Sequence, residues 1–364
     1  MGSTTTKSRK RRMQQLLRVL EGKKTALIVS HTNPDPDTIA SSLALQYFMA
    51  EVAGIKSVLA FDGIVGRAEN RALLEYLNLN LMLLEQIDPH DFDLIALVDT
   101  HQGMGNNPLP SEISIDVEID HHQTNRDGTR AGFSDIREEY GSTATMMVDY
   151  LLSAGLRIST KLATALFYAI KAETQDLGRE AKRADQKAYF TLYQLIDFQA
   201  LAKIQRASVA PEYFQDMSRA IRRTAVFDDV VISTPGKVDS PDMIAEMADT
   251  FLRLQQVHWA VVIGFHGNHM FISVRTNQPE CDAGQLVKKV VARLGTAGGH
   301  DMTAGGKIYC ENNYKKQWLL KERVKKRFLA EFGFDRRRKG KKLLAMKSPE
   351  SALIVDKNLK SRPA

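Results

Sequence analysis

Short apolar runs alternate with helical patterns over roughly the first half of the chain. Runs with the length of buried strands lie at 25–30, 57–61, 93–99 and 114–119. Apolar positions at helical spacing lie between and after these runs, at 39–50, 67–77, 142–154, 161–171 and 184–196. Because strands that alternate with helices usually form one mainly parallel sheet, this part is predicted to be an α/β domain.

The remainder of the chain predicts a connector and then a second, smaller α/β domain. Helical periodicity continues from 197 to about 223, with a break at Pro211. A strand at 226–233, a helix at 241–254, a hairpin of 259–264 and 270–275 that turns at Gly267-Asn268, and a helix at 283–294 follow. The glycine-rich residues 295–307 are predicted to form a loop.

These patterns divide the 364 residues into five parts, and a hydrophobic content of 43% is enough for two cores. The parts are a basic N-terminal extension, 1–23; a first domain, 24–196; a helical connector, 197–224; a second domain, 225–332; and a basic C-terminal tail, 333–364. Within the extension, residues 1–12 are predicted to be disordered and residues 13–20 to form a short helix.

Cysteine usage and apolar run lengths predict a cytoplasmic protein that does not enter a membrane. Cys281 and Cys310 are the two cysteines, and they form neither a disulfide framework nor a zinc knuckle. No apolar run approaches the ~20 residues of a membrane span. The N-terminus is basic but lacks the apolar core of a signal peptide.

The net charge of +7 is unevenly distributed along the chain. Residues 25–314 carry a net charge of −12, whereas residues 1–24 carry +7, residues 315–342 carry +10 and residues 343–364 carry +2. The basic ends could make weak contacts with polyanions such as longer nucleic acid, or could be solvated tails.

Acidic and histidine side chains follow three of the predicted strands. They are His31, Asp35 and Asp37 after the first run, Asp99 and His101 after the third, and Asp120, His121 and His122 after the fourth. The carboxyl ends of parallel strands meet at one edge of a sheet, so we expect these clusters to converge. Carboxylates this close repel unless a cation lies between them, and carboxylate plus imidazole suits Mn²⁺, Mg²⁺ or Zn²⁺. For the first cluster alone, an Asp-Pro turn with a chance histidine is the alternative.

Two features of the second domain suggest anion binding. The glycines of residues 295–307 would let backbone N–H groups approach an anion, with His300 and Lys307 adding charge. The run is not a Walker loop, which needs Gly-Lys-Ser/Thr before a helix, and a plain loop is the alternative. Arg275, at a strand end, is a candidate phosphate ligand, for which a surface salt bridge is the alternative.

Taken together, these residues resemble the DHH phosphoesterase superfamily, whose members include RecJ-type exonucleases, nanoRNases and pAp phosphatases, cyclic-dinucleotide phosphodiesterases and manganese pyrophosphatases. The resemblance covers residues 24–312. Its motifs match at His31, Asp35 and Asp37, at Asp99, and at Asp120-His121-His122; Gly298-Gly299-His300 and Ser273-Val-Arg275 resemble the Gly-Gly-His and Ser-x-Arg elements of the DHH-associated domain. The implied fold is a mainly parallel DHH domain followed by a smaller α/β DHH-associated domain.

The chain departs from the family at the fourth motif, where an Asp-Thr pair usually supplies a metal ligand. Here Glu173 precedes Thr174, and Asp176 is the fallback ligand. A longer Glu side chain can still bind a metal but reaches differently, so the occupancy or the metal preference of the site is open.

The resemblance implies a role for each residue at the site. One ion would be held by His31, Asp35 and Asp99, and the other by Asp37, Asp99, His121 and Glu173. Asp99 would bridge the ions, Asp120 would orient the histidines, and His122 would face the scissile phosphate. His101 would at most support these ligands. Arg275, Gly298, Gly299, His300 and Gly305 would bind substrate. The ions would be two Mn²⁺, with Mg²⁺ or Co²⁺ as substitutes.

The implied activity is a two-metal phosphoesterase that hydrolyses short RNA or DNA oligonucleotides (nanoRNA, linear dinucleotides) and/or 3′-phosphoadenosine 5′-phosphate (pAp). It would be a manganese-dependent hydrolase of the 3′–5′ exoribonuclease or pAp phosphatase type, as a monomer or a homodimer. A pyrophosphatase or exopolyphosphatase is the enzymatic alternative, although manganese pyrophosphatases carry Lys/Arg motifs in place of a Gly-Gly-His loop. Glu173 motivates a further alternative, a non-catalytic nucleotide-binding regulator.

Overall fold

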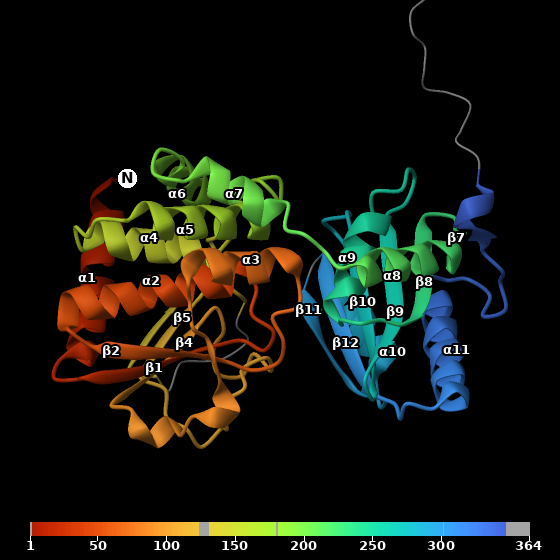
Figure 1. Ribbon diagram of the computed structural model, residues 1–364, viewed down its shortest axis with the longest axis horizontal. Helices are drawn as coiled ribbons and strands as arrows, with labels where there is room; N and C mark the ends of the chain where they lie inside the picture. The colour runs from red at the N-terminus through yellow and green to blue at the C-terminus, as the bar shows by residue number, and fades with distance from the viewer. Residues whose placement is uncertain (1, 124–130, 180, 301, 347–364) are drawn as a thin grey trace, which may run out of the picture. The chain divides into compact units, whose positions relative to one another are not determined.

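The chain folds into two units, Met1–Ser208 and Val209–Ala364, in a computed structural model that describes residues 2–123, 131–179, 181–300 and 302–346 (Figure 1). Residues 2–8 and 300 are described by their backbone. Among the described residues, each helix is too short or too polar to cross a lipid bilayer.

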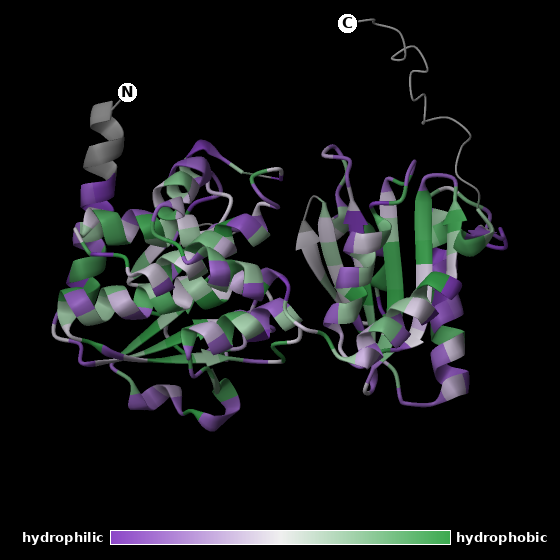
Figure 2. Cartoon of the chain, turned by 45° about the horizontal axis from the view of Figure 1, so that its top comes forward, coloured by the Kyte–Doolittle hydropathy of each residue, from purple (hydrophilic) through white to green (hydrophobic). Residues whose placement is uncertain are grey.

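The first unit is built on a six-stranded sheet in which every pair of neighbours is parallel, as predicted. The strands are β1 (Thr25–Ser30), β2 (Lys56–Phe61), β3 (Met82–Leu83), β4 (Leu94–Val98), β5 (Val117–Asp120) and β6 (Phe133–Ile136), in the order β3-β2-β1-β4-β5-β6. All five residues of β4 are buried, which explains its uninterrupted apolar run. The strands of both units are largely coloured as hydrophobic in Figure 2. Strands β3 and β6 were not predicted, because the first is very short and the second alternates polar residues.

Helices cover one face of this sheet and loops cover the other. The helices are α1 (Gly2–Leu20), α2 (Pro36–Ala53), α3 (Ala68–Leu77), α4 (Thr143–Ser153), α5 (Thr160–Glu173), α6 (Arg183–Tyr193) and α7 (Phe198–Gln205). Phe48 of α2 and Phe167 of α5 lie in the core on the helical side. On the opposite face, Leu109 and Ile113 pack beside the short 3₁₀ helices η1 (Leu84–Gln86) and η2 (Pro89–Asp91).

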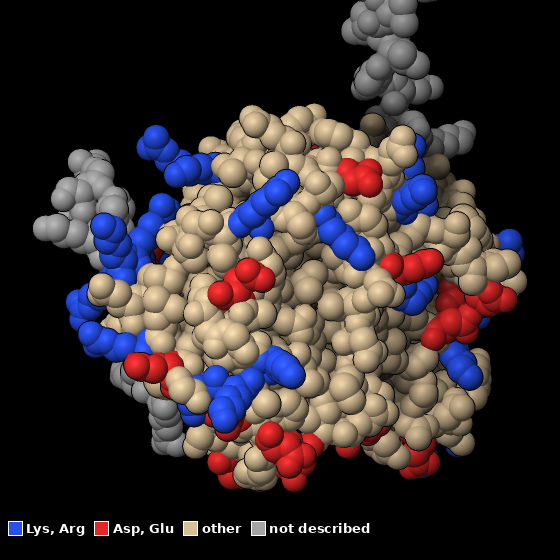
Figure 3. Space-filling model, turned by 60° about the vertical axis from the view of Figure 1, so that its left-hand side comes forward, with Lys and Arg blue, Asp and Glu red and all other residues tan. Residues whose placement is uncertain are grey.

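The predicted helix over residues 13–20 is confirmed, but it begins earlier than expected. Helix α1 runs without a break from Gly2 to Leu20, so the prediction of disorder was wrong for residues 2–12. Leu16 is fully buried in the core of the first unit. Arg9 Nη2 lies 2.9 Å from Asp149 Oδ2, and Arg12 Nε lies 3.8 Å from Asp135 Oδ1. Lysine and arginine side chains gather on the surface beside this helix (Figure 3). Two of its basic residues therefore pair with acids of the same unit.

The second unit is a seven-stranded mixed sheet with helices on both faces. Its strands are β7 (Thr224–Phe227), β8 (Val230–Lys237), β9 (Trp259–His266), β10 (His269–Thr276), β11 (Thr296–His300), β12 (Thr303–Tyr309) and β13 (Lys341–Lys342), in the order β11-β12-β10-β9-β8-β7-β13. Helices α8 (Pro211–Arg222) and α9 (Asp242–Phe251) cover one face, and α10 (Ala283–Val291) and α11 (Tyr314–Glu331) the other. The predicted hairpin of β9 and β10 is confirmed, with its turn at Gly267-Asn268.

Two elements of the second unit differ from the prediction. The strand expected at 226–233 is two antiparallel strands, because Asp228 adopts a positive φ of 53° and turns the chain. The glycine-rich run expected as a loop is a hairpin in which β11 pairs with β12. A Cβ on Gly295 would lie 2.1 Å from the Lys307 carbonyl oxygen, so the close approach of these strands requires glycine there.

The connector and the tail predicted from the sequence both contribute to the folded units. Helix α7 packs on α3 and α5, whereas α8 packs on β8 and α9. In the tail, β13 pairs with β7, and Arg338 donates two hydrogen bonds to Asp228. Residues 347–364 lie outside the described part of the chain.

The buried side of α1 gives a test of its contribution to stability. Leu16→Ala should lower the free energy of unfolding of the first unit by about 2–5 kcal/mol, because it leaves a cavity under α2 and α4. Urea denaturation followed by circular dichroism measures the change. Leu17→Ala is the matched control, because Leu17 is 38% exposed on the same helix. Equal stability of both variants would contradict the docking of α1.

Candidate metal centre

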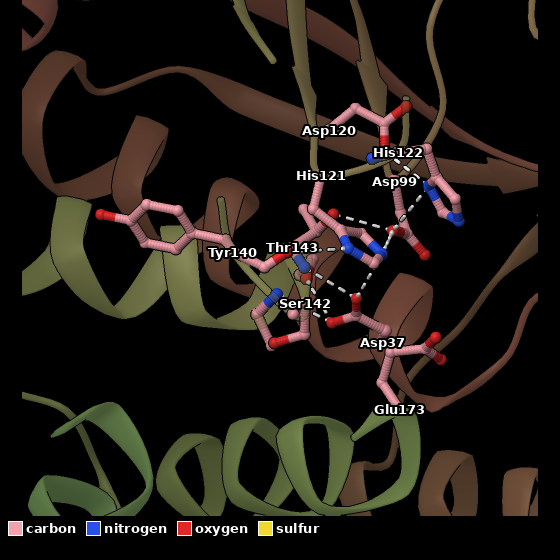
Figure 4. A network of polar contacts seen from close by, with 12 residues as sticks. Asp37, Asp99, Asp120, His121, His122, Tyr140, Ser142, Thr143 and Glu173 are labelled. Carbon is pink, nitrogen blue, oxygen red and sulfur yellow. Dashed lines mark hydrogen bonds and ion pairs between the residues drawn. The ribbon is translucent and has the colours of Figure 1, made fainter. Parts of the chain in front are cut away.

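The three strands that carry acidic and histidine side chains at their ends are neighbours, in the order β1-β4-β5. His31 follows β1, Asp99 follows β4, and Asp120 ends β5 just before His121 and His122. Figure 4 shows Asp37, Asp99 and His121 facing one another, with Asp120 beside His122. The parallel topology therefore brings distant residues of the chain to one edge of the sheet.

Asp99 lies at the middle of this group and is 1% exposed. Its φ of 60° is in the left-handed region, a strained conformation that is more frequent at functional sites. Thr38 Oγ1 donates to Asp99 Oδ2 at 2.7 Å, and Thr143 Oγ1 donates to Asp99 Oδ1 at 2.8 Å. Burial opposes ionisation, but the neighbouring imidazolium groups of His31 and His122 hold the pKa of Asp99 well below its usual range.

Asp37 joins the start of α2 to the start of α4. Its Oδ2 accepts from the backbone N–H of Thr143 and its Oδ1 from that of Ala144, both at 2.8 Å. Burial and the negative charge of Asp99 raise the pKa of Asp37 well above its usual value. Two buried carboxylates in this arrangement repel each other, and a cation between them would remove that cost.

His121 presents an unpaired nitrogen to both carboxylates. Its Nδ1 lies 3.3 Å from the Tyr140 carbonyl oxygen and donates to it, which leaves Nε2 as the acceptor. Nε2 is buried without a hydrogen-bond partner among the described residues, 3.8 Å from Asp37 Oδ2 and 3.7 Å from Asp99 Oδ1. A buried imidazole lone pair between carboxylates is a donor set that suits a divalent cation.

Asp120 holds two histidines. It accepts from His101 Nδ1 at 2.6 Å and from His122 Nδ1 at 2.8 Å. Burial opposes ionisation, but these bonds lower the pKa of Asp120 below its usual range. Although burial opposes protonation, the hydrogen bond to Asp120 raises the pKa of His122 to about 10. His101 thus contacts Asp120 and helps to fix the position of its carboxylate.

His31 and Asp35 complete a second cluster around Asp99. His31 Nδ1 contacts the Thr32 carbonyl oxygen at 3.0 Å, and Nε2 lies 3.6 Å from Asp99 Oδ2 and 3.9 Å from Asp35 Oδ2. Asp35 also caps α2 by accepting from the Thr38 N–H at 3.0 Å.

Within the described part of the chain, two groups bring potential ligand atoms within 4.8 Å of one another: His31, Asp35 and Asp99, and Asp99, His121 and His122. They share Asp99. The carboxylate and imidazole groups of these two clusters therefore form a donor set that suits a divalent cation.

Glu173 and Asp176 point to different surroundings. Glu173 is the last residue of α5, half-buried, and lies beside Asp37 in Figure 4; burial and the charge of Asp35 raise its pKa. Asp176 is 58% exposed, pairs with Lys171 Nζ at 2.6 Å and accepts from Tyr189 OH at 2.7 Å. Residues 175–177 all have positive φ, so the chain turns sharply after α5 and directs Asp176 away from the cluster.

Three residues that the sequence argument missed support the cluster. Thr38 and Thr143 hold Asp99 through their hydroxyl groups, and Arg179 Nη2 donates to the Glu173 carbonyl oxygen at 3.0 Å. Thr143 follows Ser142, which caps α4, so a Ser-Thr pair at a helix start was a readable signal. Thr38 and Arg179 had no local signal.

The residues expected to bind substrate lie in the second unit. Arg275 donates through Nε to Asp249 Oδ1 at 2.7 Å and through Nη1 to Ser273 Oγ at 2.9 Å, so it forms the salt bridge that was its alternative role and is held in place. Gly298 pairs with Gly305, which pairs with Ser273. Gly299 has a φ of 122°, and the backbone of His300 ends β11.

Two family models match the chain. The model of the DHH family, N-terminal domain, matches residues 25–170, and the model of the DHHA1 domain matches residues 228–326. These ranges fall in the first and the second unit, respectively.

Curated relatives match parts of the chain. The chain is 33% identical over 302 residues to an uncharacterized protein of Methanocaldococcus jannaschii. The matched region makes up 82% of this chain and 61% of that protein. The chain is also 25% identical over 149 residues to a probable manganese-dependent inorganic pyrophosphatase of Listeria welshimeri. That matched region makes up 41% of this chain and 47% of that protein. The chain therefore spans about half to three fifths of the length of these relatives.

Two solved structures share the fold at low identity. An exopolyphosphatase-related protein from Bacteroides fragilis superposes with a TM-score of 0.71 at 16% identity, over 88% of this chain and 97% of that one. RecJ from Thermus thermophilus in complex with Mn²⁺ superposes with a TM-score of 0.53 at 12% identity, over 92% of this chain and 55% of that one.

The contrast between Glu173 and Asp176 gives a direct test of the metal ligands. Glu173→Gln should weaken binding of one divalent ion, since an amide oxygen carries no charge. Asp176→Asn, the matched control, should leave binding as in the parent, because its carboxylate already pairs with Lys171. Calorimetric titration with Mn²⁺ measures both. Weakened binding in the Asp176 variant alone would reverse the assignment.

Proposed function

The chain belongs to the DHH family and carries a DHHA1 domain, and on this premise we propose that it is a metal-dependent phosphoesterase. Its proposed substrates are short oligonucleotides, such as nanoRNA and linear dinucleotides, and/or pAp, and its proposed cofactors are two Mn²⁺ ions. The observation that carries the proposal is that two clusters share the buried Asp99, and that one of them contains His121, whose buried Nε2 has no hydrogen-bond partner among the described residues.

The proposed metal ligands form two sets that share Asp99. The residues that would hold the ions are His31, Asp35 and Asp99 for one, and Asp37, Asp99, His121 and Glu173 for the other. Bound divalent ions would polarise the phosphoryl group and lower the pKa of water. The threonine hydroxyls at Asp99 and the α4 N–H groups at Asp37 fix these carboxylates before any ion binds.

His122 and Asp120 act on the substrate side of the proposed mechanism. Asp120 accepts a hydrogen bond from His122 Nδ1, which sets the orientation of the imidazole ring. The N–H at His122 Nε2 would stabilise charge on a phosphoryl oxygen or protonate the leaving oxygen. Removal of Asp120 would free the ring to rotate, so Asp120 is a positioning residue.

In the second unit, Arg275 and the glycine hairpin are the proposed phosphate ligands. Asp249 and Ser273 fix the Arg275 guanidinium, and a planar cation held in this way suits a phosphate. A Cβ on Gly298 would meet nothing within 4 Å, so the surface there is open to a ligand.

A pyrophosphatase or exopolyphosphatase is the second candidate, since relatives carry those names. The Listeria pyrophosphatase aligns over 149 residues, however, whereas the DHHA1 match adds residues 228–326. The second unit is therefore the part that should decide the substrate.

A substrate panel with Mn²⁺ tests the proposed function. The panel holds pAp, pApA, pGpG, an RNA pentamer, pyrophosphate and polyphosphate, and a nucleotide substrate should show the highest kcat/KM. Asp99→Ala should lower that value by about 100-fold or more, because it removes a ligand shared by both clusters. Faster release of phosphate from pyrophosphate or polyphosphate would favour the second candidate. Metal binding without any hydrolysis would favour the non-catalytic regulator.

Arg275→Ala tests the role of the second unit in substrate binding. Loss of a buried charged contact with phosphate should cost about 2–5 kcal/mol in kcat/KM for a 5′-phosphorylated dinucleotide. Binding of Mn²⁺, measured by calorimetry, should match the parent, and so should hydrolysis of bis-p-nitrophenyl phosphate, which lacks a remote phosphate. Arg253→Ala, at an exposed arginine after α9, is the control. Normal cleavage of dinucleotides by the Arg275 variant would exclude this role.

A further inference from the structure

One face of the second sheet carries a set of side chains that the proposed catalysis does not use. His269 on β10 pairs in register with Tyr309 on β12, and Phe271 pairs with Lys307. Residues paired across antiparallel strands share a face, and so do residues two apart along one strand. These four side chains, which we call the aromatic face, therefore project from the same side of the sheet.

The aromatic face lies on the side opposite to α10. A Cβ on Gly306 would meet Val287 and Val291 of α10, and Gly306 points the other way from its neighbours Gly305 and Lys307. On the aromatic side, α9 packs on β9 and β10. Tyr309 is 65% exposed and Lys307 is exposed. The edge of the sheet at β11 and β12 is thus accessible on this side.

The side chains of the aromatic face are arranged as separate rings with a cation among them. The His269 ring lies 5.7 Å from the Tyr309 ring and 6.2 Å from the Phe271 ring, and Lys307 Nζ lies 5.8 Å from the centre of the Phe271 ring. Phe271 is half-buried against the core below α9, which fixes it. Ring faces beside a positive charge are the chemistry that binds nucleobases and their phosphates.

The glycines beside the rings leave room for a flat ligand. Gly298 of β11 pairs with Gly305 of β12, which pairs with Ser273 of β10, and these three positions lie on the same side of the sheet as the rings. A Cβ on Gly305 would make one ordinary contact, at 3.6 Å, and a Cβ on Gly298 would meet nothing. A base or sugar can therefore lie directly on the backbone of β11 and β12.

We propose that the aromatic face binds a single-stranded oligonucleotide, with bases stacked on Phe271 and Tyr309 and a phosphate held by Lys307. This rests on the proposed function, because it extends the substrate beyond the phosphate that Arg275 would hold. The positive charge among the rings selects a polyanion over a second copy of this chain, because lysine is depleted from the cores of protein interfaces.

The register gives the bound strand a direction. Rows of paired residues succeed one another along β10, from Arg275 with Thr303, through Ser273 with Gly305 and Phe271 with Lys307, to His269 with Tyr309. Successive rows are about 7 Å apart, the length of two strand residues. An oligonucleotide with its phosphate at Arg275 would cross the glycines and reach Phe271 and then Tyr309. Affinity should therefore rise with length beyond a dinucleotide.

Oligonucleotide binding by the full chain tests the proposal. Fluorescence anisotropy in EDTA, which prevents hydrolysis, gives the Kd for 5′-phosphorylated RNA and DNA of two, four and six nucleotides. Tyr309→Ala should raise the Kd of the hexanucleotide about tenfold, and that of the dinucleotide by much less, because one stacked base is lost. Lys307→Gln should lower the slope of log Kd against log salt by about one.

The matched control is Tyr314→Ala, since Tyr314 is 84% exposed but starts α11, away from this face. Its hexanucleotide Kd should stay within twofold of the parent. Phe271→Leu, which keeps an apolar side chain in the core, should weaken the hexanucleotide as Tyr309→Ala does. Equal losses with RNA and DNA would support stacking, whereas a loss with RNA alone would restrict the ligand to RNA.

Several outcomes would overturn the proposal. One is that the parent protein binds no hexanucleotide. Another is that the Tyr309 and Phe271 variants both keep the affinity of the parent. A third is that Tyr309→Ala converts a dimer to a monomer in sedimentation while oligonucleotide binding persists. Length-dependent binding that Tyr309→Ala weakens, in a protein that hydrolyses no nucleotide, would support the aromatic face and refute only the proposed function.

Discussion

The first unit depends on the burial of negative charge at the carboxyl ends of three strands. Asp37, Asp99 and Asp120 are each at most 1% exposed, and two unit charges 4 Å apart in a protein interact by about 4 kcal/mol at an effective dielectric constant of 20. Hydroxyl groups of Thr38 and Thr143 stabilise one carboxylate, the start of α4 stabilises another, and two histidines stabilise the third. The strand order and the placement of α2 and α4 are thus coupled to charge compensation at one edge.

This compensation extends to the N-terminal helix through a chain of contacts. Tyr140, whose carbonyl oxygen holds His121, lies under the Arg137 guanidinium at 5.0 Å. The Arg137 guanidinium pairs with Asp135, and the backbone N–H of Arg137 donates to the Asp120 carbonyl oxygen at 2.9 Å. Arg12 of α1 approaches the same Asp135. The orientation of a candidate metal ligand therefore rests on a network that includes a helix more than a hundred residues away in sequence.

The sequence revealed the parts of this arrangement that depend on short-range patterns. Parallel strands with buried faces read as apolar runs, so the convergence of His31, Asp99 and Asp120 could be inferred from their positions after those runs. The partners of α1 are acids at positions 135 and 149, which local periodicity cannot reveal. The glycine-rich sequence of β11 and β12 is typical of a loop. It forms strands because the two segments pair closely, and local sequence patterns do not reveal that pairing. The sharp turn at residues 175–177 separates Glu173 from Asp176, although both are acidic and close in sequence.

The two borders of the second sheet differ in a way that affects association between molecules. An edge strand offers backbone groups on which another chain can add a strand, and such addition leads to aggregation. At one border, β13 consists of Lys341 and Lys342, and a strand that is this short and this charged is a poor template. At the other, the β11 glycines provide no side chains for a neighbouring strand to pack against. Both borders therefore oppose strand addition, one by charge repulsion and the other because its glycines offer an added strand little to pack against.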